Sequence, residues 1–84
     1  MTELLFYDFK SRQDYNVMVQ RGLDMRATFE CEYDDSYDDD PADIISEVYF
    51  DYDSLTKGEK ISLRALGKRL GAKCTIQVNN DVDF

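Results

Sequence analysis

The sequence predicts a single α+β domain with the ferredoxin-like order βαββαβ, in which a four-stranded antiparallel sheet carries two helices on one face. Three observations lead to this prediction. Four short segments have the apolar runs or the alternation of strands, and two segments have the 3.6-residue periodicity of helices. The length of 84 residues is enough for one sheet and one helical layer around a thin core. No repeat or linker divides the chain, so 1–84 is expected to be one acidic domain, with 79–84 as a loosely held tail.

The first strand and the first helix are expected in the N-terminal quarter of the chain. Leu4–Phe9 is an almost continuous apolar run, which is typical of a central strand. Across 12–21 the apolar residues share one helical face, and Gly22 is placed to end the helix. The same residues also alternate as a strand would, with Tyr15, Val17 and Val19 on one side, but we favour the helix and keep the strand as the alternative.

The next two strands are expected to form a hairpin around an acidic connection. Residues 28–34 and 44–52 alternate apolar and polar side chains, so each strand would pack one face and carry carboxylates on the other. The connection 35–43 is too rich in Asp, with one Pro, to continue a strand.

The second helix has explicit boundary signals. Thr56 and Glu59 have the spacing of a capping box, and Gly71 is a natural terminator. Leucines line one face of this helix, and a basic stripe lies nearly opposite them. The stripe consists of Lys57, Lys60, Arg64 and Lys68. The last strand is expected at Lys73–Val78.

The usual ferredoxin-like strand order places the first and third strands at the centre of the sheet and leaves one face open. That face is predicted to carry Thr75 and Gln77, then Leu4, Phe6 and Asp8, then Glu47, Tyr49, Asp51 and Asp53, then Thr28, Glu30, Glu32 and Asp34. Cys31 and Cys74 would point inward from opposite edges as small hydrophobes, without a disulfide between them. With no signal peptide and no apolar run of membrane length, a reducing cytoplasm is the expected location.

Charge is concentrated in the middle of the chain. Eighteen acids against ten bases give a net charge of −8, and residues 24–53 hold twelve acids and one base. Such a field disfavours direct contact with nucleic acid or an anionic membrane and attracts a basic partner. A basic face opposite an acidic one would also permit self-association, so a monomer or a weak homodimer is expected.

The chemistry of common enzymes is missing from the sequence. The chain has no histidine, no glycine-rich phosphate loop and no nucleophile elbow, so we expect neither catalysis nor a cofactor. The spacing of an EF-hand fails in the acidic connection, because residues other than Gly and Glu stand at its sixth and twelfth positions. An irregular, weak divalent-cation site stays open at Asp38, Asp39, Asp40 and Asp43.

The hairpin is the candidate partner-binding surface. Carboxylates two residues apart on a strand lie about 6.7 Å apart, and those on neighbouring strands about 4.8 Å apart, which is of the order of phosphate separations. Tyr37, Tyr49 and Phe6 are candidate aromatic anchors. The predicted partner-binding residues are Glu30, Glu32, Asp34, Asp35, Tyr37, Asp38, Asp39, Asp40, Asp43, Glu47, Tyr49, Asp51 and Asp53.

Through its length, its charge and the segments E-C-E-Y-D-D and D-D-D-P-A-D, the chain resembles the small acidic proteins that phages and mobile elements encode against host nucleases. These are the anti-CRISPR and anti-restriction nucleic-acid mimics. The resemblance implies stoichiometric inhibition, in the host cytoplasm, of a basic nucleic-acid-binding protein. Two alternatives stay open: an acidic immunity protein or antitoxin against a cognate basic toxin nuclease, and a small cytoplasmic domain with a weak calcium site.

Overall fold

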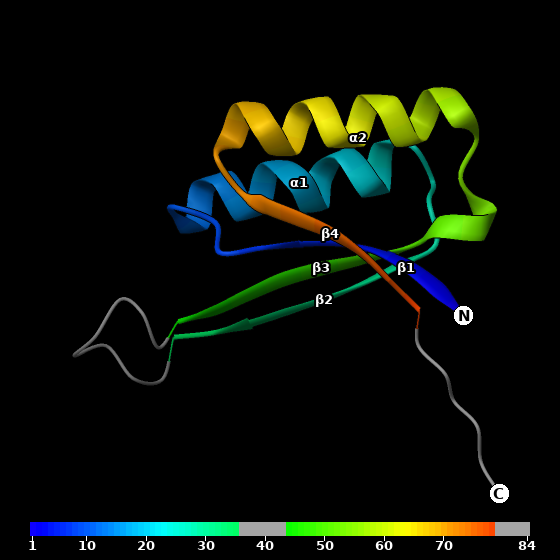
Figure 1. The fold of residues 1–84 in the computed structure, drawn as a ribbon. Coiled ribbons are helices and arrows are strands. Elements are labelled where there is room, and N and C mark those ends of the chain that lie inside the picture. Colours follow the sequence, from blue (N-terminus) through cyan, green and yellow to red (C-terminus); the bar gives the residue numbers. More distant parts are fainter. Residues whose placement is uncertain (36–43, 79–84) are drawn as a thin grey trace, which may run out of the picture.

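The computed structural model describes residues 1–35 and 44–78 of the protein (Figure 1). Its four strands form one antiparallel sheet in the order β2-β3-β1-β4, and both helices lie on the same face of that sheet. The predicted ferredoxin-like order βαββαβ is therefore confirmed. The elements are β1 (Thr2–Tyr7), α1 (Arg12–Asp24), β2 (Phe29–Asp34), β3 (Ile45–Asp51), the short 3₁₀ helix η2 (Tyr52–Ser54), α2 (Lys57–Leu70) and β4 (Lys73–Val78).

Residues 12–21 are helical, which confirms the favoured interpretation and excludes the strand. The Ser11 hydroxyl accepts the Asp14 N–H at 3.1 Å and so caps α1. Tyr15 and Met18 lie about one turn apart on α1, and both are buried in the core between the helix and the sheet. The helical face therefore enters the core, while Val17, which the strand interpretation would have placed with Tyr15, is exposed.

Gly22 does not end α1, and this prediction was wrong. The helix continues to Asp24, and Gly22 is buried where α1 crosses the sheet. A Cβ atom at Gly22 would lie 2.8 Å from the Phe29 ring. Gly67 of α2 has the same role, since a Cβ there would lie 2.5 Å from the Phe6 ring. Both glycines allow a helix to lie directly on an aromatic ring of the sheet.

The boundary signals of α2 are confirmed. Thr56 and Glu59 form the reciprocal capping box, with N···O distances of 2.8 and 3.1 Å. Gly71 closes the helix with a φ of +74°, which only glycine adopts without strain. Ile61 lies outside the apolar stripe and is 60% exposed.

The core lies between the sheet and the helices, and it corrects the predicted orientation of β1. Leu4 and Phe6 are fully buried on the helix side, so they do not line the open face. Phe6 packs edge-on against Phe50 of β3, with ring centroids 5.9 Å apart, and is therefore no surface anchor. Asp8 follows the strand with a φ of +54°. The open face of β1 instead carries Glu3, Leu5 and Tyr7.

The two cysteines lie on opposite edge strands, and both are free and exposed. Their registers, Cys31 with Val48 and Cys74 with Phe6, place both on the helix side as predicted. Partial burial raises the pKa of the Cys74 thiol above its ordinary value. In the part of the chain that the structure describes, no helix is long and apolar enough to cross a membrane.

Candidate functional site

The face of the sheet opposite the helices is the candidate site. Successive residues of a strand point to opposite faces, so side chains that alternate with the buried Leu4, Phe6, Val48 and Phe50 point away from the helices. We name the six carboxylates brought together in this way the acidic face. They are Glu3, Glu30, Glu32, Asp34, Glu47 and Asp51.

Two pairs of carboxylates on the acidic face are directly opposed. Glu32 of β2 is the cross-strand partner of Glu47 in β3, and Glu3 of β1 is the partner of Asp51. Like charges in directly opposite positions destabilise a sheet. The registers therefore concentrate negative charge on this face, although the fold would be more stable if the same carboxylates were scattered over the surface.

Tyr49 lies among these carboxylates, directly opposite Glu30. Burial, the hydrogen bond and charge of Glu47, and the charges of Glu32 and Glu3 raise the pKa of Tyr49 to about 12. Its phenol therefore stays neutral, beside a shallow depression that Glu3, Glu30 and Glu32 line with it. An aromatic ring surrounded by carboxylates is a favourable contact for a guanidinium or an ammonium group.

The strands bring one basic side chain to this face, at its corner. Lys73 of β4 lies opposite Tyr7, and its Nζ is 3.1 Å from Asp8 Oδ2. The hydrogen bond and charge of Asp8 raise the pKa of Lys73. The basic stripe of α2 lies on the other side of the molecule, where Lys60 Nζ is 4.0 Å from the centre of the Tyr52 ring.

Not every predicted site residue joins the acidic face. Asp53 lies beyond the end of β3 in η2, and its N–H donates to Asp51 Oδ1 at 3.3 Å. Asp35 follows β2 and is 3.8 Å from the Arg12 guanidinium at the start of α1. The candidate divalent-cation site at Asp38, Asp39, Asp40 and Asp43 lies outside the described residues, and so do all the remaining predicted residues. They are Tyr37, Asp38, Asp39, Asp40 and Asp43.

Glu3 is the member of the acidic face that the sequence prediction missed. The signal was present, since Glu3, Leu5 and Tyr7 alternate with Leu4 and Phe6. An ionised carboxylate is almost never fully buried unless it is paired, so the parity of Glu3 marks the solvent side of β1.

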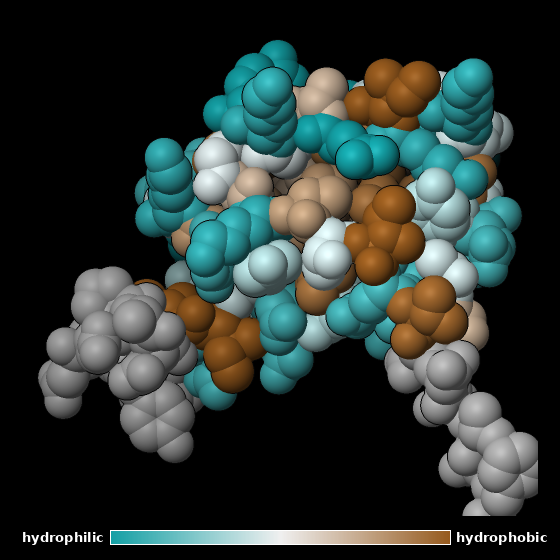
Figure 2. All heavy atoms as spheres, in the orientation of Figure 1, coloured by the Kyte–Doolittle hydropathy of each residue, from teal (hydrophilic) through white to brown (hydrophobic). Residues whose placement is uncertain are grey.

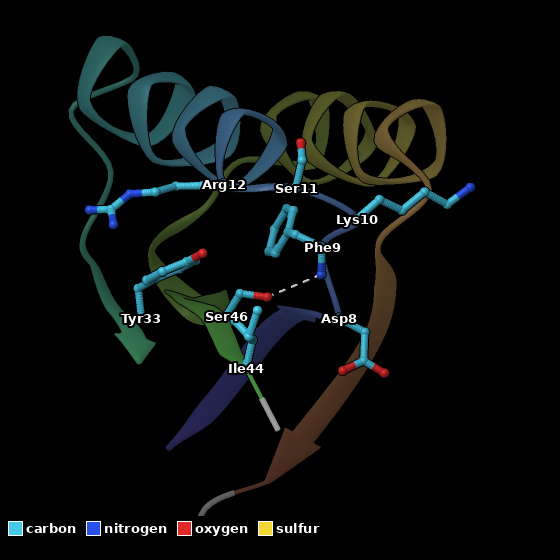
Figure 3. A pocket seen from close by; sticks show the side chains of 8 residues that line it. All are labelled: Asp8, Phe9, Lys10, Ser11, Arg12, Tyr33, Ile44 and Ser46. Atoms are coloured by element: carbon cyan, nitrogen blue, oxygen red, sulfur yellow. Dashed lines mark hydrogen bonds between the residues drawn. The ribbon is translucent and has the colours of Figure 1, made fainter. Parts of the chain in front are cut away.

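A cavity lies where β1 leads into α1, but its polar groups do not converge (Figure 3). The Phe9 N–H donates to Ser46 Oγ at 3.1 Å, which ties this turn to β3. The Arg12 guanidinium lies 4.6 Å from the centre of the Tyr33 ring, and the Lys10 side chain points away from the cavity. These contacts hold the turn in place and leave no group directed at a ligand.

Comparison of the chain with models of protein families, with curated proteins and with solved structures gives no match. Among the described residues, no three acidic, cysteine or histidine side chains come together as metal ligands.

Proposed function

We propose that the protein is a non-catalytic inhibitor that binds a basic nucleic-acid-binding protein, such as a nuclease or a CRISPR effector, through the acidic face. The carboxylates take the place of a phosphate backbone in the partner's groove. The observation that supports this proposal most directly is the register of the sheet, which opposes Glu32 to Glu47 and Glu3 to Asp51.

The sheet holds its charges in a fixed array. Neighbouring positions on this face lie about 6.7 Å apart along a strand and about 4.8 Å apart between strands. Because the backbone is already ordered by hydrogen bonds on both sides of β3 and β1, the array loses little conformational entropy on binding. A basic groove would therefore meet a pre-arranged set of anions.

Tyr49 is the proposed anchor of the contact. An arginine of the partner can stack on the phenol ring while its N–H groups reach Glu30 or Glu47, which combines a cation–π contact with a charge-assisted hydrogen bond. Aromatic residues near the centre of an interface often carry much of the binding free energy.

The test is capture of a partner at about 150 mM salt, where the Debye length is about 8 Å. The bait proteins are the original chain, the variant Glu30→Gln/Glu32→Gln and the control Asp14→Asn/Asp24→Asn. Both variants lose two negative charges, but only the first loses them from the acidic face. Captured proteins are then challenged with an excess of duplex DNA or RNA.

We expect the original chain and the control to retain a nucleic-acid-binding protein that the added nucleic acid displaces, and the Glu30/Glu32 variant to lose it. Equal retention by both variants would refute a binding role for the acidic face. Retention of one toxin nuclease encoded next to this gene would favour the immunity alternative.

A further inference from the structure

We infer that the exposed edge of β4 pairs with β4 of a second copy of this chain, forming a two-fold dimer with a continuous eight-stranded sheet. This inference does not depend on the proposed function. β4 is at the edge of the sheet, and its side chains are mostly exposed. Figure 2 shows apolar side chains (brown) exposed among hydrophilic ones on the side of the molecule where β4 runs in front in Figure 1.

The registers show which backbone groups face outward from this edge. In a regular antiparallel sheet, successive residues direct their N–H and C=O to opposite neighbours. The Asp51 N–H donates to the Thr28 carbonyl at 2.9 Å, so odd-numbered residues of β3 face β2 and even-numbered ones face β1. The pairings of β1 with β3 and with β4 then turn the odd-numbered residues of β4 toward β1. The outward N–H and C=O groups belong to Cys74, Ile76 and Val78.

These three residues are complementary to themselves about a two-fold axis at Ile76. Ile76 lies opposite Ile76 of the second copy, and Cys74 lies opposite Val78. Each of these pairs exchanges two N–H···O bonds, so every outward backbone group of the described strand finds a partner. Both helical layers then lie on one side of the extended sheet and both acidic faces on the other.

The two edges of the sheet differ in the features that prevent pairing. The β2 edge carries Glu30, Glu32 and Asp34, and charges on an edge strand oppose the addition of another strand. β4 carries one charged residue, Lys73, at its first position. Its exposed side chains include Ile76 and Val78, which are 43% and 65% exposed.

The two-fold arrangement also keeps like charges apart at the interface. Arg64 and Lys68 of α2 lie beside Cys74, near the start of β4. In the antiparallel dimer this basic end lies opposite Val78 of the second copy, and away from the basic end of that copy. The acidic faces lie side by side and repel each other through the solvent, so added salt should strengthen the dimer.

The first test is sedimentation equilibrium of the original chain and of two variants, each adding one positive charge. Ile76→Lys places two like charges directly opposite each other at the two-fold axis, and we expect the dimer dissociation constant to rise about tenfold or more. Val17→Lys is the matched control, because Val17 is 45% exposed and lies on α1, away from β4. We expect it to dimerise like the original chain.

The second test needs no variant. It is amide hydrogen exchange of the original chain. The amides of Thr75 and Gln77 are internal references, because they already donate to β1. The amides of Cys74, Ile76 and Val78 become protected only when the dimer forms. We expect their protection to rise with protein concentration. A dimer that Ile76→Lys leaves intact would overturn the inference. A monomer at every concentration, with these three amides always exchanging fast, would also overturn it and leave the edge to a strand of another protein.

Discussion

Removing one carboxylate from a directly opposed pair should stabilise this protein, and Glu32→Gln is the clearest case. Glu32 and Glu47 are cross-strand partners, and the backbone pattern makes them a hydrogen-bonded pair with Cα atoms about 5.5 Å apart. Two unit charges about 6 Å apart in water repel by about 0.7 kcal/mol, and a Debye length of about 8 Å roughly halves this value. Glu30 and Asp34, two residues away along β2, add to the repulsion.

We therefore expect Glu32→Gln to raise the free energy of unfolding by about 0.5 kcal/mol, within the range measured for cross-strand pairs. For a domain of this size the gain corresponds to a rise in melting temperature of about 2 to 4 °C. The assay is thermal and urea denaturation followed by circular dichroism at neutral pH, at low salt and at about 1 M salt, where the Debye length is about 3 Å.

Glu30→Gln is the matched control, because it makes the same change on the same strand and face, but opposite Tyr49. It should stabilise the protein less than Glu32→Gln at low salt, and high salt should remove the difference. The double-mutant cycle with Glu47→Gln isolates the pair from the hydrogen bond between Glu47 and Tyr49. An equal gain from both single variants, or a difference that persists at high salt, would refute direct opposition as the cause.

Three further outcomes follow from contacts of α2 and of the sheet. Gly67→Ala should cost about 1 to 3 kcal/mol in urea denaturation, because its Cβ would lie 2.5 Å from an aromatic ring, whereas Gly58→Ala, with nothing within 4 Å, should be neutral or stabilising. Thr56→Ala removes the N-cap and should cost about 1 kcal/mol, seen as a lower melting temperature. Because folding raises the pKa of Tyr49 from 10.0 to about 12, its contribution to stability is complete below pH 10 and is lost as the pH rises through 12. Tyr49→Phe should therefore reduce the loss of stability at alkaline pH. Part of that loss should remain in this variant, because burial also raises the pKa of Tyr15.

The sequence was most informative where a local signal fixes a local structure. The bounds of α2 depend on Thr56, Glu59 and Gly71, whose capping contacts lie within one helical turn, and these predicted bounds are confirmed. Glycine is common at helix ends, but Gly22 lies inside α1, where the absence of a side chain leaves room for the Phe29 ring. That difference depends on which ring lies below the helix, and no local pattern contains it.

The candidate site was predictable in composition but not in arrangement. The alternation of β2 and β3 was enough to place Glu30, Glu32 and Glu47 on one face. In β1, Leu4, Leu5 and Phe6 are apolar at successive positions, so their alternation does not orient the strand; the parity of Glu3 was the one available signal, and the packing of Phe6 against α2 fixes the orientation. The opposition of Glu32 to Glu47 depends on register, which is a tertiary property.

The separation of charge between the two layers has a consequence for how the protein meets other molecules. The basic stripe of α2 and the acidic face lie on opposite sides of a body whose Cα atoms span 18 Å along its shortest axis. Within the described residues this separation gives a charge dipole roughly normal to the sheet, in addition to the net charge of −8 of the chain. In the field of a cationic groove it should rotate to present the sheet before contact, which shortens the orientational search that usually limits association rates. Near an anionic surface the same dipole turns α2 toward that surface. The sign of the surrounding field therefore decides whether the sheet or the helices face the other molecule.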